Sequence, residues 1–446
     1  DGGVLLSYAL GNWQAPFGIA LLLDRLSAML LLLTAILASV AVIYACRGDD
    51  QRGENFHALL QFQLLGINGA FLTADLFNLF VFFEILLISS YSLLLHGHGR
   101  ARVAAGLHYV VLNLFGSALF LIALGMLYGV AGTLNMADLA HKVGLANAEQ
   151  RPLLMAAGLL LLVVFGLKAA ILPLYFWLPR AYSAATAPVA ALFAIMTKVG
   201  VYSILRVYTL VFGTAAGPLE GLVHGWLWPL ALLTLVAGLI GALAVQTLGM
   251  LVSYLVVVSV GTLTAGLALG TVEALSASLY YLLHSTLIAA GLFLLVDMIA
   301  RQRGDKHDAL VQGSKLMQPH LLGGLFFFAA IAVAGLPPLS GFLGKLLYLQ
   351  AVSGMQALQL WPILLIGGLV TLVSLSRAGS MLFWKVGLHM HDRASSDIWR
   401  TLGCMVLLGA SLALVLGAAP ILAYTQATAR QLLDLAPYLA LVGGGV

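Results

Sequence analysis

Long apolar stretches, separated by short polar turns, follow one another from one end of the chain to the other. Most are about 20 residues or longer, the length that crosses a hydrocarbon core of about 30 Å. Strand-type alternation of apolar and polar residues is absent. The pattern therefore predicts an all-α polytopic membrane protein with about twelve transmembrane helices. The predicted spans are 18–46, 55–73, 75–96, 103–130, 153–178, 187–213, 225–246, 248–271, 276–300, 320–355, 360–385 and 403–426.

Composition agrees with this pattern and leaves little room for an extramembrane domain. Of the 446 residues, 62% are hydrophobic and 9% are charged, whereas a soluble domain carries about 25% charged residues. The net charge of +4 comes from lysines and arginines in the turns, and we do not interpret it as a nucleic-acid surface.

The basic residues are distributed unequally between the two predicted sides. If the spans alternate, most fall on one side, which the positive-inside rule makes cytoplasmic, so that both ends of this chain lie outside. This larger group contains Arg47, Arg52, Arg100, Arg102, Arg180, Arg301, Arg303, Lys306, Lys315, Lys385, Arg393 and Arg400. The smaller group contains Lys142, Arg151, Arg206 and Arg430.

Two predicted spans contain prolines that interrupt a helix. Pro173 follows Lys168 in LKAAILPLYFWLP, and Pro337 and Pro338 precede Lys345 in AGLPPLSGFLGK. A proline removes one helical hydrogen bond and crowds the carbonyl four residues back. The carbonyls expected to be freed are those of Ala169, Val333 and Ala334, and in lipid they need water, a side chain or a neighbouring helix. Simple kinks in packed helices are the alternative, but two breaks beside two lysines favour discontinuous, hydrated helices.

The two interrupted helices occupy corresponding positions in two blocks of five spans. Repeats with broken helices in matching positions are typical of secondary transporters. Five spans is an odd number, so under simple alternation the second block starts on the opposite side and the repeat is inverted. The predicted organisation is an N-terminal region with one span (1–54), a first repeat (55–213), a second, inverted repeat (225–385), and a C-terminal loop with the last span (386–446).

Charged residues inside four of the spans are the main functional signal. Glu84, Lys168, Lys198 and Lys345 each interrupt an apolar segment. A charge at mid-bilayer costs roughly 2.5–3.5 kcal/mol even on the mildest scale, so such residues are usually retained for a function. Glu84 and Lys168 are candidates for a coupled pair whose making and breaking moves a proton, with a structural ion pair as the alternative. That the deep bases are lysines favours proton transfer, because arginine stays protonated.

Histidines add further candidates along the same segments. His284 lies in the middle of a span and is suited to exchange protons near neutral pH, although such a residue alone is more often hydrogen-bonded within the packing. His108 is nearer a helix end, and both interpretations stay open. Asp24 and Arg25 begin an apolar helix, where a local structural role is at least as reasonable. Asp75, Asp297, Arg206 and Arg377 are interfacial or unassigned.

The two cysteines carry no recognisable pattern. Cys46 and Cys404 are far apart, and neither has a CxxC partner or a nearby ligand set in the sequence. We therefore expect two ordinary thiols buried in the membrane, with no metal or iron–sulfur site. No quinone or NADH site is evident, and the chain is expected to hold no cofactor.

Three segments carry a resemblance to a known family. FNLFVFFEILLISSY around Glu84, GLKAAILPLYFWLPRAYSAATAPVAALFAIMTKVGVY with Lys168 and Lys198, and GLPPLSGFLGK before Lys345 resemble the antiporter-like subunits of respiratory complex I and of Mrp cation/proton antiporters. LYGVAGTLNMADLA (127–140) and LLLDRLSAMLLLLT (21–34) favour the D-subunit group of the Mrp system. The resemblance covers essentially the whole chain.

The resemblance implies a fold and a role for each residue. It implies two inverted five-helix repeats, each with a broken helix and a half-channel; family members commonly have fourteen helices, so two spans are expected upstream of Asp1. Glu84 and Lys168 would be the coupled pair, Lys198 and His284 the central relay, and Lys345 the terminal base. Some related complex I subunits carry Glu at the last position, so Lys345 excludes that subtype.

The leading hypothesis is a proton-translocating subunit of a multisubunit Na⁺(K⁺)/H⁺ antiporter in a bacterial cell (inner) membrane, with the other subunits, the lipid bilayer, protons and Na⁺ or K⁺ as partners. The alternative within the same fold is a pump module of complex I or of a membrane-bound hydrogenase. A membrane transferase is disfavoured because no acidic cluster faces the membrane to hold a metal and a diphosphate. A structural scaffold would not need three deep lysines.

Overall fold

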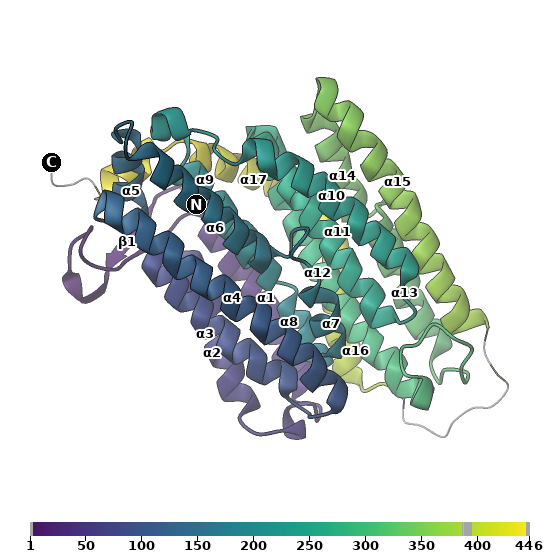
Figure 1. The fold of residues 1–446 in the computed structure, drawn as a ribbon. Coiled ribbons are helices and arrows are strands. Elements are labelled where there is room, and N and C mark those ends of the chain that lie inside the picture. Colours follow the sequence, from purple (N-terminus) through teal and green to yellow (C-terminus); the bar gives the residue numbers. More distant parts are fainter. Residues whose placement is uncertain (1–2, 386, 388–394, 443–446) are drawn as a thin grey trace.

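The computed structural model describes residues 3–385, 387 and 395–442, and this part is predominantly a bundle of helices (Figure 1). Among the described residues, ten helices are long and apolar enough to cross a membrane, and two shorter apolar helices, Phe56–Leu72 and Pro319–Ala334, accompany them. The prediction of an all-α polytopic membrane protein is confirmed.

The elements follow one another along the chain in two parts. The first part contains β1 (Leu6–Ala9), β2 (Ala20–Leu23), α1 (Arg25–Ala45), α2 (Phe56–Leu72), α3 (Leu76–Leu95), α4 (Arg100–Ala131), α5 (Met136–Gly144), α6 (Arg151–Ala169), α7 (Trp177–Ala184), α8 (Ala187–Phe193) and α9 (Met196–Leu210). The second contains α10 (His224–Ala244), α11 (Leu248–Leu269), α12 (Val272–Arg303), α13 (Pro319–Ala334), α14 (Ser340–Ala351), α15 (Gly354–Gly379), α16 (Ile398–Leu416), α17 (Ala418–Leu433) and α18 (Ala436–Val442). Short 3₁₀ turns lie at Leu10–Asn12, Asp50–Arg52, Thr214–Leu219 and Gly304–Lys306, and a π turn at Ser380–Trp384.

Both predicted helix breaks are present. The first interrupts the chain between α6 and α7, and the second interrupts it between α13 and α14. Lys168 lies in the last turn of α6, before the first break, and Lys345 lies in α14, after the second. The inversion of the two repeats, and the division at 55–213 and 225–385, remain predictions.

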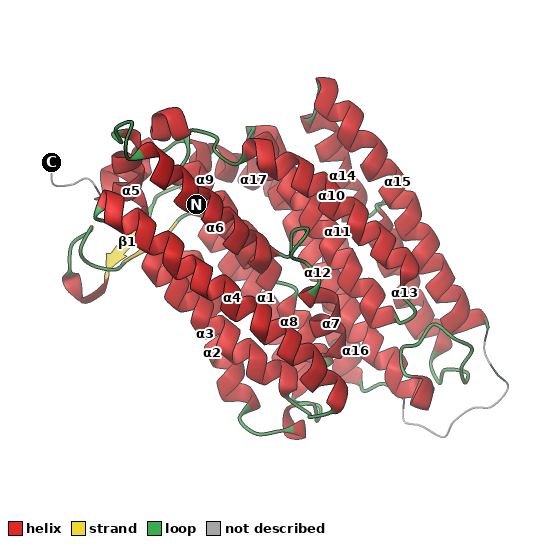
Figure 2. Ribbon diagram, viewed as in Figure 1, coloured by secondary structure: helices red, strands yellow, loops and turns green. Residues whose placement is uncertain are grey.

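Two predicted spans differ from the structure, and one helix was not predicted. The span expected at 18–46 begins as β2, which pairs antiparallel with β1 (Figure 2), and the helix starts only after Asp24, whose carboxylate accepts the Ser27 backbone N–H at 2.8 Å. The span expected at 403–426 is divided at Gly417 into α16 and α17. The short helix α5 was not predicted, because its nine residues are too few to cross a bilayer.

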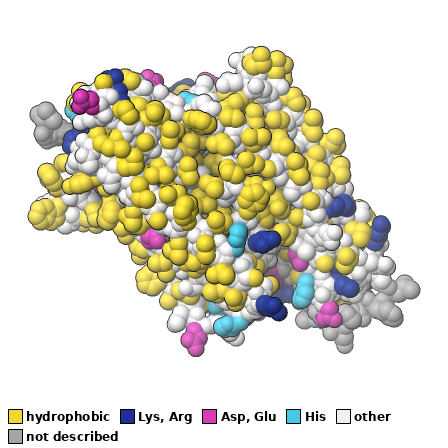
Figure 3. All heavy atoms as spheres, in the orientation of Figure 1, with side chains coloured by type: hydrophobic (Ala, Val, Ile, Leu, Met, Phe, Trp, Pro, Cys, Tyr) yellow, Lys and Arg dark blue, Asp and Glu magenta, His cyan; other side chains and the backbone are white. Residues whose placement is uncertain are grey.

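Helix α12 lies at the centre of the packing and contacts α8, α11, α13, α14, α16 and α17. Most of its residues are buried, whereas α4 and α15 expose large apolar side chains along their length. The face seen in Figure 3 is mainly hydrophobic, and most of the charged side chains on it lie in its lower part and at its upper left. An apolar outer surface around a polar-containing centre is the arrangement expected for a protein whose solvent is lipid.

Candidate functional site

Glu84 and Lys168 lie near one another, but a serine hydroxyl stands between them. Ser117, on α4, donates to Oε1 of the half-buried Glu84 on α3. Lys168 Nζ in turn donates to Ser117 Oγ at 3.4 Å. Among the ion pairs of the described residues, none joins Glu84 directly to Lys168 within 4.0 Å. The predicted direct pair is therefore replaced by a hydroxyl bridge.

Further neutral acceptors fix the position of the Lys168 ammonium. Its Nζ donates to the backbone carbonyl of Asn113 at 3.3 Å and to Asn113 Oδ1 at 3.4 Å. The ring of Phe83 lies below it, 5.9 Å from Nζ to the ring centroid. Asn113 and Ser117 are four residues apart and share one face of α4, so that face meets both α3 and α6. Ser117 was not predicted from the sequence, because a serine in an apolar helix gives no local sign of a partner on another helix.

Lys198 on α9 is fully buried and hydrogen-bonded to hydroxyls. Its Nζ donates to Thr197 Oγ1 at 3.3 Å and to Ser259 Oγ of α11 at 3.4 Å. Gly200 brings this part of α9 against α6, since a Cβ atom there would lie 2.4 Å from the backbone nitrogen of Ala169. The backbones of α9 and α6 are therefore in contact next to Lys198 and Lys168.

His284 on α12 belongs to a buried chain of hydroxyls. Its Nδ1 is 2.7 Å from Ser340 Oγ, and Ser340 Oγ is 2.7 Å from Ser411 Oγ. Ser340 begins α14 and Ser411 is on α16, so three helices meet at this imidazole. The hydrogen-bonded packing position expected as one interpretation is present, and the contacts are of a kind that also transfers protons.

Lys345 is bound to the carbonyls that the second helix break was expected to free. Its Nζ donates to Ala334 O at 2.7 Å and to Val333 O at 3.3 Å. The predicted acceptors Val333 and Ala334 are therefore confirmed. The break serves as a binding site for the ammonium group, because a continuous helix would have occupied both oxygens internally.

A small cavity lies beside His284, and two residues that line it contact Lys198 and Lys345. It measures about 30 Å³, and Ser259, His284 and Val333 are among the residues that line it. Ser259 is bound to Lys198, and the Val333 carbonyl is bound to Lys345. A cavity of this size has room for about one or two water molecules. His284 thus lines a site at which a water can sit, and Lys198 and Lys345 each contact another residue that lines it.

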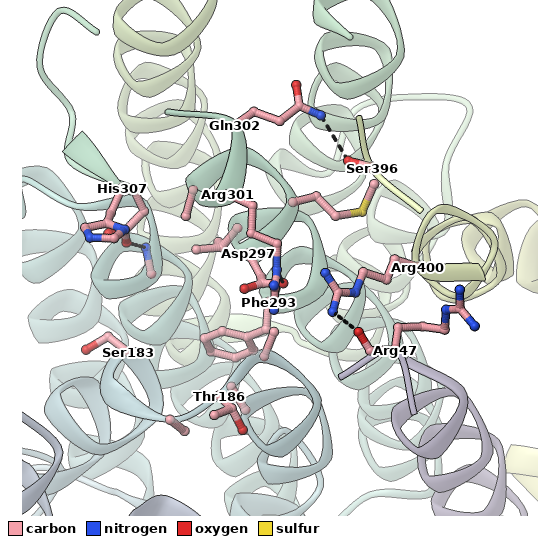
Figure 4. Close-up of a pocket in the computed structure, with 18 of the residues that line it drawn as sticks. Arg47, Ser183, Thr186, Phe293, Asp297, Arg301, Gln302, His307, Ser396 and Arg400 are labelled. Atoms are coloured by element: carbon pink, nitrogen blue, oxygen red, sulfur yellow. Dashed lines mark hydrogen bonds and ion pairs between the residues drawn. The ribbon is translucent and has the colours of Figure 1, made fainter. Parts of the chain in front are cut away.

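A much larger cavity of about 1230 Å³ opens at one end of the bundle (Figure 4). Its lining includes five arginines that were predicted to lie on one side, namely Arg47, Arg52, Arg102, Arg301 and Arg400. Arg393, assigned to the same side, lies outside the described residues. The clustering supports the predicted grouping of basic residues at one membrane surface.

The arginines at this cavity are held by carboxylates. The buried Asp49 accepts Arg301 at 2.7 Å, Arg52 at 3.0 Å and Arg400 at 3.2 Å. Asp297 also pairs with Arg301, at 2.5 Å. Asp49 ties the turn after α1 to the end of α12 and the start of α16, so the cluster is a structural junction that the sequence did not reveal.

A second ion pair lies at the opposite end of α1. Arg206 on α9 approaches Asp24 to 2.7 Å, and both side chains are buried. Tyr438 of α18 donates to the same Asp24 carboxylate, and Arg206 donates to the Tyr438 hydroxyl at 3.1 Å. The local structural role expected for Asp24 is confirmed by its capping of α1, and the ion pair extends that role across the fold.

The remaining candidates do not join the chain of lysines. His108 is exposed on α4, and Asp75 caps α3 by accepting the Asn78 backbone N–H at 2.8 Å. Arg377 donates to the carbonyl of Val245 at 2.7 Å. The expectation of two buried thiols is wrong for Cys46, which is exposed because it lies in the turn that follows α1; Cys404 is buried.

Comparisons with known proteins show the family of this chain. Residues 73–371 match the family described as NADH:quinone oxidoreductase/Mrp antiporter, TM. The chain is similar to the D subunit of a probable K⁺/H⁺ antiporter of Rhizobium meliloti (strain 1021), with 44% identity over 96% of this chain and 84% of the relative. The D subunit of a Na⁺/H⁺ antiporter of Alkalihalophilus pseudofirmus is 39% identical over 96% of this chain and 87% of that protein. Among solved structures, a chain of the Mrp complex from Dietzia sp. DQ12-45-1b superimposes with a TM-score of 0.84, at 26% identity, over 99% of this chain and 90% of that chain.

Proposed function

Because this chain belongs to the NADH:quinone oxidoreductase/Mrp antiporter family, we propose that it is the proton-translocating subunit of a multisubunit Na⁺(K⁺)/H⁺ antiporter. Its partners would be the other membrane subunits of that complex, in a bacterial cell (inner) membrane. The observation that carries the proposal is the row of buried or half-buried lysines, each bound to neutral hydrogen-bonding groups rather than to a carboxylate.

The proposed route starts at the bridge between Glu84 and Lys168. The Ser117 hydroxyl contacts both charged groups, so a proton moves between them by way of one oxygen. Moving α3 relative to α4 breaks the Ser117–Glu84 bond and removes the nearest anion from Lys168. The ammonium then has only neutral acceptors and loses its proton more readily, because burial penalises the charged form.

The route continues from Lys198 to Lys345 by way of the small cavity. Ser259 contacts Lys198 and lines the cavity together with His284 and Val333. A water held there receives a proton from the first lysine and delivers it toward the second. His284 takes part as a donor or acceptor whose orientation is fixed by Ser340. In this scheme the subunit transfers protons along the membrane midplane while the complex exchanges Na⁺ or K⁺, driven by the proton gradient.

A second function uses the same route with a different energy source. A chain of this family could serve as a proton-pumping module of complex I or a membrane-bound hydrogenase, where redox chemistry in other subunits drives it. The high identity to proteins named as D subunits of antiporters favours the antiporter over this alternative. The two functions differ in what starts the flux: an imposed Na⁺ or K⁺ gradient for the antiporter, and electron transfer for the pump.

The decisive experiment measures Na⁺- and K⁺-dependent proton flux in vesicles that contain the full complex. Glu84→Gln and Lys168→Met are compared with wild type after assembly of each complex has been verified. We expect both variants to lose flux. Glu149→Gln is the matched control, because Glu149 is an exposed carboxylate in the loop before α6 and takes no part in the lysine contacts described above. Normal flux in assembled Glu84→Gln and Lys168→Met complexes would overturn the proposal.

A further inference from the structure

The turn between α1 and α2 brings together three side chains of a kind that bind transition metals. Cys46 follows the last residue of α1, Asp50 begins the 3₁₀ turn Asp50–Arg52, and His57 lies in the first turn of α2. One ligand atom from each of the three lies within 4.8 Å of the others. His57 Nε2 is 3.2 Å from Asp50 Oδ2. None of these residues contributes to the proton route described above.

The distances are close to those of a bound zinc ion. Zn²⁺ binds imidazole nitrogen and carboxylate oxygen at about 2.0–2.2 Å and thiolate at about 2.3 Å, so tetrahedral ligand atoms lie roughly 3.3–3.7 Å apart. The separation of 3.2 Å between Asp50 Oδ2 and His57 Nε2 is just below this range. The thiol of Cys46 must move closer by at most about 1 Å, which a side-chain rotation at an exposed position allows.

Asp50 has an oxygen available for such an ion. Its Oδ1 is buried and has no hydrogen-bond partner, although Oδ2 faces His57. A buried carboxylate oxygen without a partner is costly, and an ion bound by both oxygens of Asp50 would satisfy it. A simple Asp50–His57 ion pair with an uninvolved thiol is the competing explanation, but it leaves Oδ1 unsatisfied.

The turn that carries the three side chains is held in place from the other side. The neighbouring Asp49 binds Arg52, Arg301 and Arg400. The positive charges nearest the three ligands are also neutralised: Arg47 pairs with Asp397 at 2.7 Å, and Arg52 pairs with Asp49. The thiolate and the carboxylate then balance the two charges of a divalent cation. Backbone positions fixed in advance reduce the entropy lost when a metal binds.

We propose that Cys46, Asp50 and His57 form a binding site for one Zn²⁺-like divalent transition-metal ion at the arginine-rich end of the bundle. Because Cys46 and His57 are exposed, the fourth position is open to water or to a fourth ligand. The site is not expected to bind Na⁺ or K⁺, because these hard ions take oxygen ligands. Thiolate and imidazole instead select zinc, cobalt and related ions. The proposal does not depend on the proposed transport function.

The test uses Co²⁺ as a spectroscopic probe on the purified full complex. Titration of wild type is expected to give a thiolate-to-cobalt charge-transfer band that saturates at one ion per chain and disappears when Zn²⁺ is added. Cys46→Ser is expected to abolish the band, and His57→Gln to weaken Co²⁺ binding at least tenfold. Cys404→Ala and His98→Gln are the matched controls, because they remove the buried cysteine and a histidine of the turn before α4 that is outside the three ligands.

Each outcome of the titration decides for or against the site. Because other subunits of the complex bring their own side chains, the readout is the difference between wild type and each variant. A band that persists in Cys46→Ser, or the absence of any thiolate band in wild type, overturns the proposal. Loss of the band in Cys404→Ala but not in Cys46→Ser would assign the thiolate to Cys404 and would also overturn the proposal. All three ligands are at least partly exposed, so their substitution is not expected to disturb folding.

Discussion

The lysines and the paired arginines in this protein differ in the groups that they contact. Lys168 and Lys198 donate only to hydroxyls, an amide oxygen and a backbone carbonyl. Arg206 and Arg400, by contrast, contact the carboxylates of Asp24 and Asp49 directly. One set of charges is solvated by neutral dipoles and the other is neutralised by fixed anions.

Under the proposed function, this difference separates lysines that give up a proton from arginines that hold the fold. A guanidinium stays protonated, so a paired arginine is a permanent link between elements. A lysine among neutral acceptors gives up its proton without leaving an unpaired carboxylate behind. The arginine clusters lie at the two ends of α1, where they join helices, whereas the lysines lie along the interior between those ends. We therefore expect mutations in the two regions to affect different properties.

The largest expected effect is on folding, from Asp24→Asn. The asparagine preserves a cap for α1 but leaves Arg206 buried without its anion. Breaking a buried ion pair in this way typically costs about 3–5 kcal/mol. Thermal unfolding of the assembled complex should show the loss. The double variant Asp24→Asn with Arg206→Met should recover most of it, because no unpaired charge remains; a double variant as unstable as the single one would contradict the interpretation.

Lys198→Met is expected to have the reverse effect: proton flux is lost, whereas the free energy of unfolding changes little. The side chain keeps its approximate volume, and Ser259 retains its bond to the Val256 carbonyl at 2.7 Å. We expect the free energy of unfolding to change by less than about 2 kcal/mol, since replacing a buried charge by an apolar group is often neutral. Proton flux should fall to the background of empty vesicles. A variant that unfolds like Asp24→Asn would show that Lys198 is structural.

Ser117→Ala should give an intermediate effect confined to transport. The substitution removes the hydroxyl between Glu84 and Lys168, and a hydrogen bond to a charged group contributes about 1.5–3 kcal/mol. We expect proton flux to fall at least roughly tenfold, the change that corresponds to about 1.4 kcal/mol. Ser117→Thr keeps the hydroxyl and is the control. Equal flux in the alanine and wild-type complexes would mean that the bridge is not on the route.

Phe83→Leu should produce the smallest change. The ring lies 5.9 Å from Lys168 Nζ, where a cation–π contact contributes about 0.5–1 kcal/mol. A leucine removes this contact and fills most of the space, so flux should change less than about fivefold. Phe83→Tyr retains an aromatic ring and should resemble wild type. A complete loss of flux in Phe83→Leu would indicate that the ring positions Glu84 or Lys168 more strongly than the geometry implies.

Much of the architecture follows from the sequence because its signals are local. Apolar length predicts the spans, and the prolines predict both breaks and the carbonyls of Val333 and Ala334 that bind Lys345. These features depend on covalent geometry and on the absence of water in the bilayer core. The buried lysines and the broken helices could therefore be identified before any helix had been placed beside another.

The connecting groups could not be predicted in the same way. Serines in apolar helices usually bond to their own backbone, as Ser203 does with Val199 O and Ser253 with Gly249 O. Nothing local distinguishes these serines from Ser117. Its hydroxyl reaches Glu84 only because α3 and α4 pack with the faces that carry Glu84 and Ser117 toward each other. Asp49 was missed for a related reason, since two of its three arginines come from distant parts of the chain.

The size of the cavity between Ser259, His284 and Val333 limits which ion can use the route. A volume of about 30 Å³ holds about one or two waters, whereas a metal cation needs a full set of oxygen ligands or its own hydration shell. A proton passes such a point by exchanging hydrogen bonds, without any atom heavier than hydrogen changing place. On the proposed route this constriction would pass protons, and we expect the exchanged Na⁺ or K⁺ to cross the membrane by a separate path.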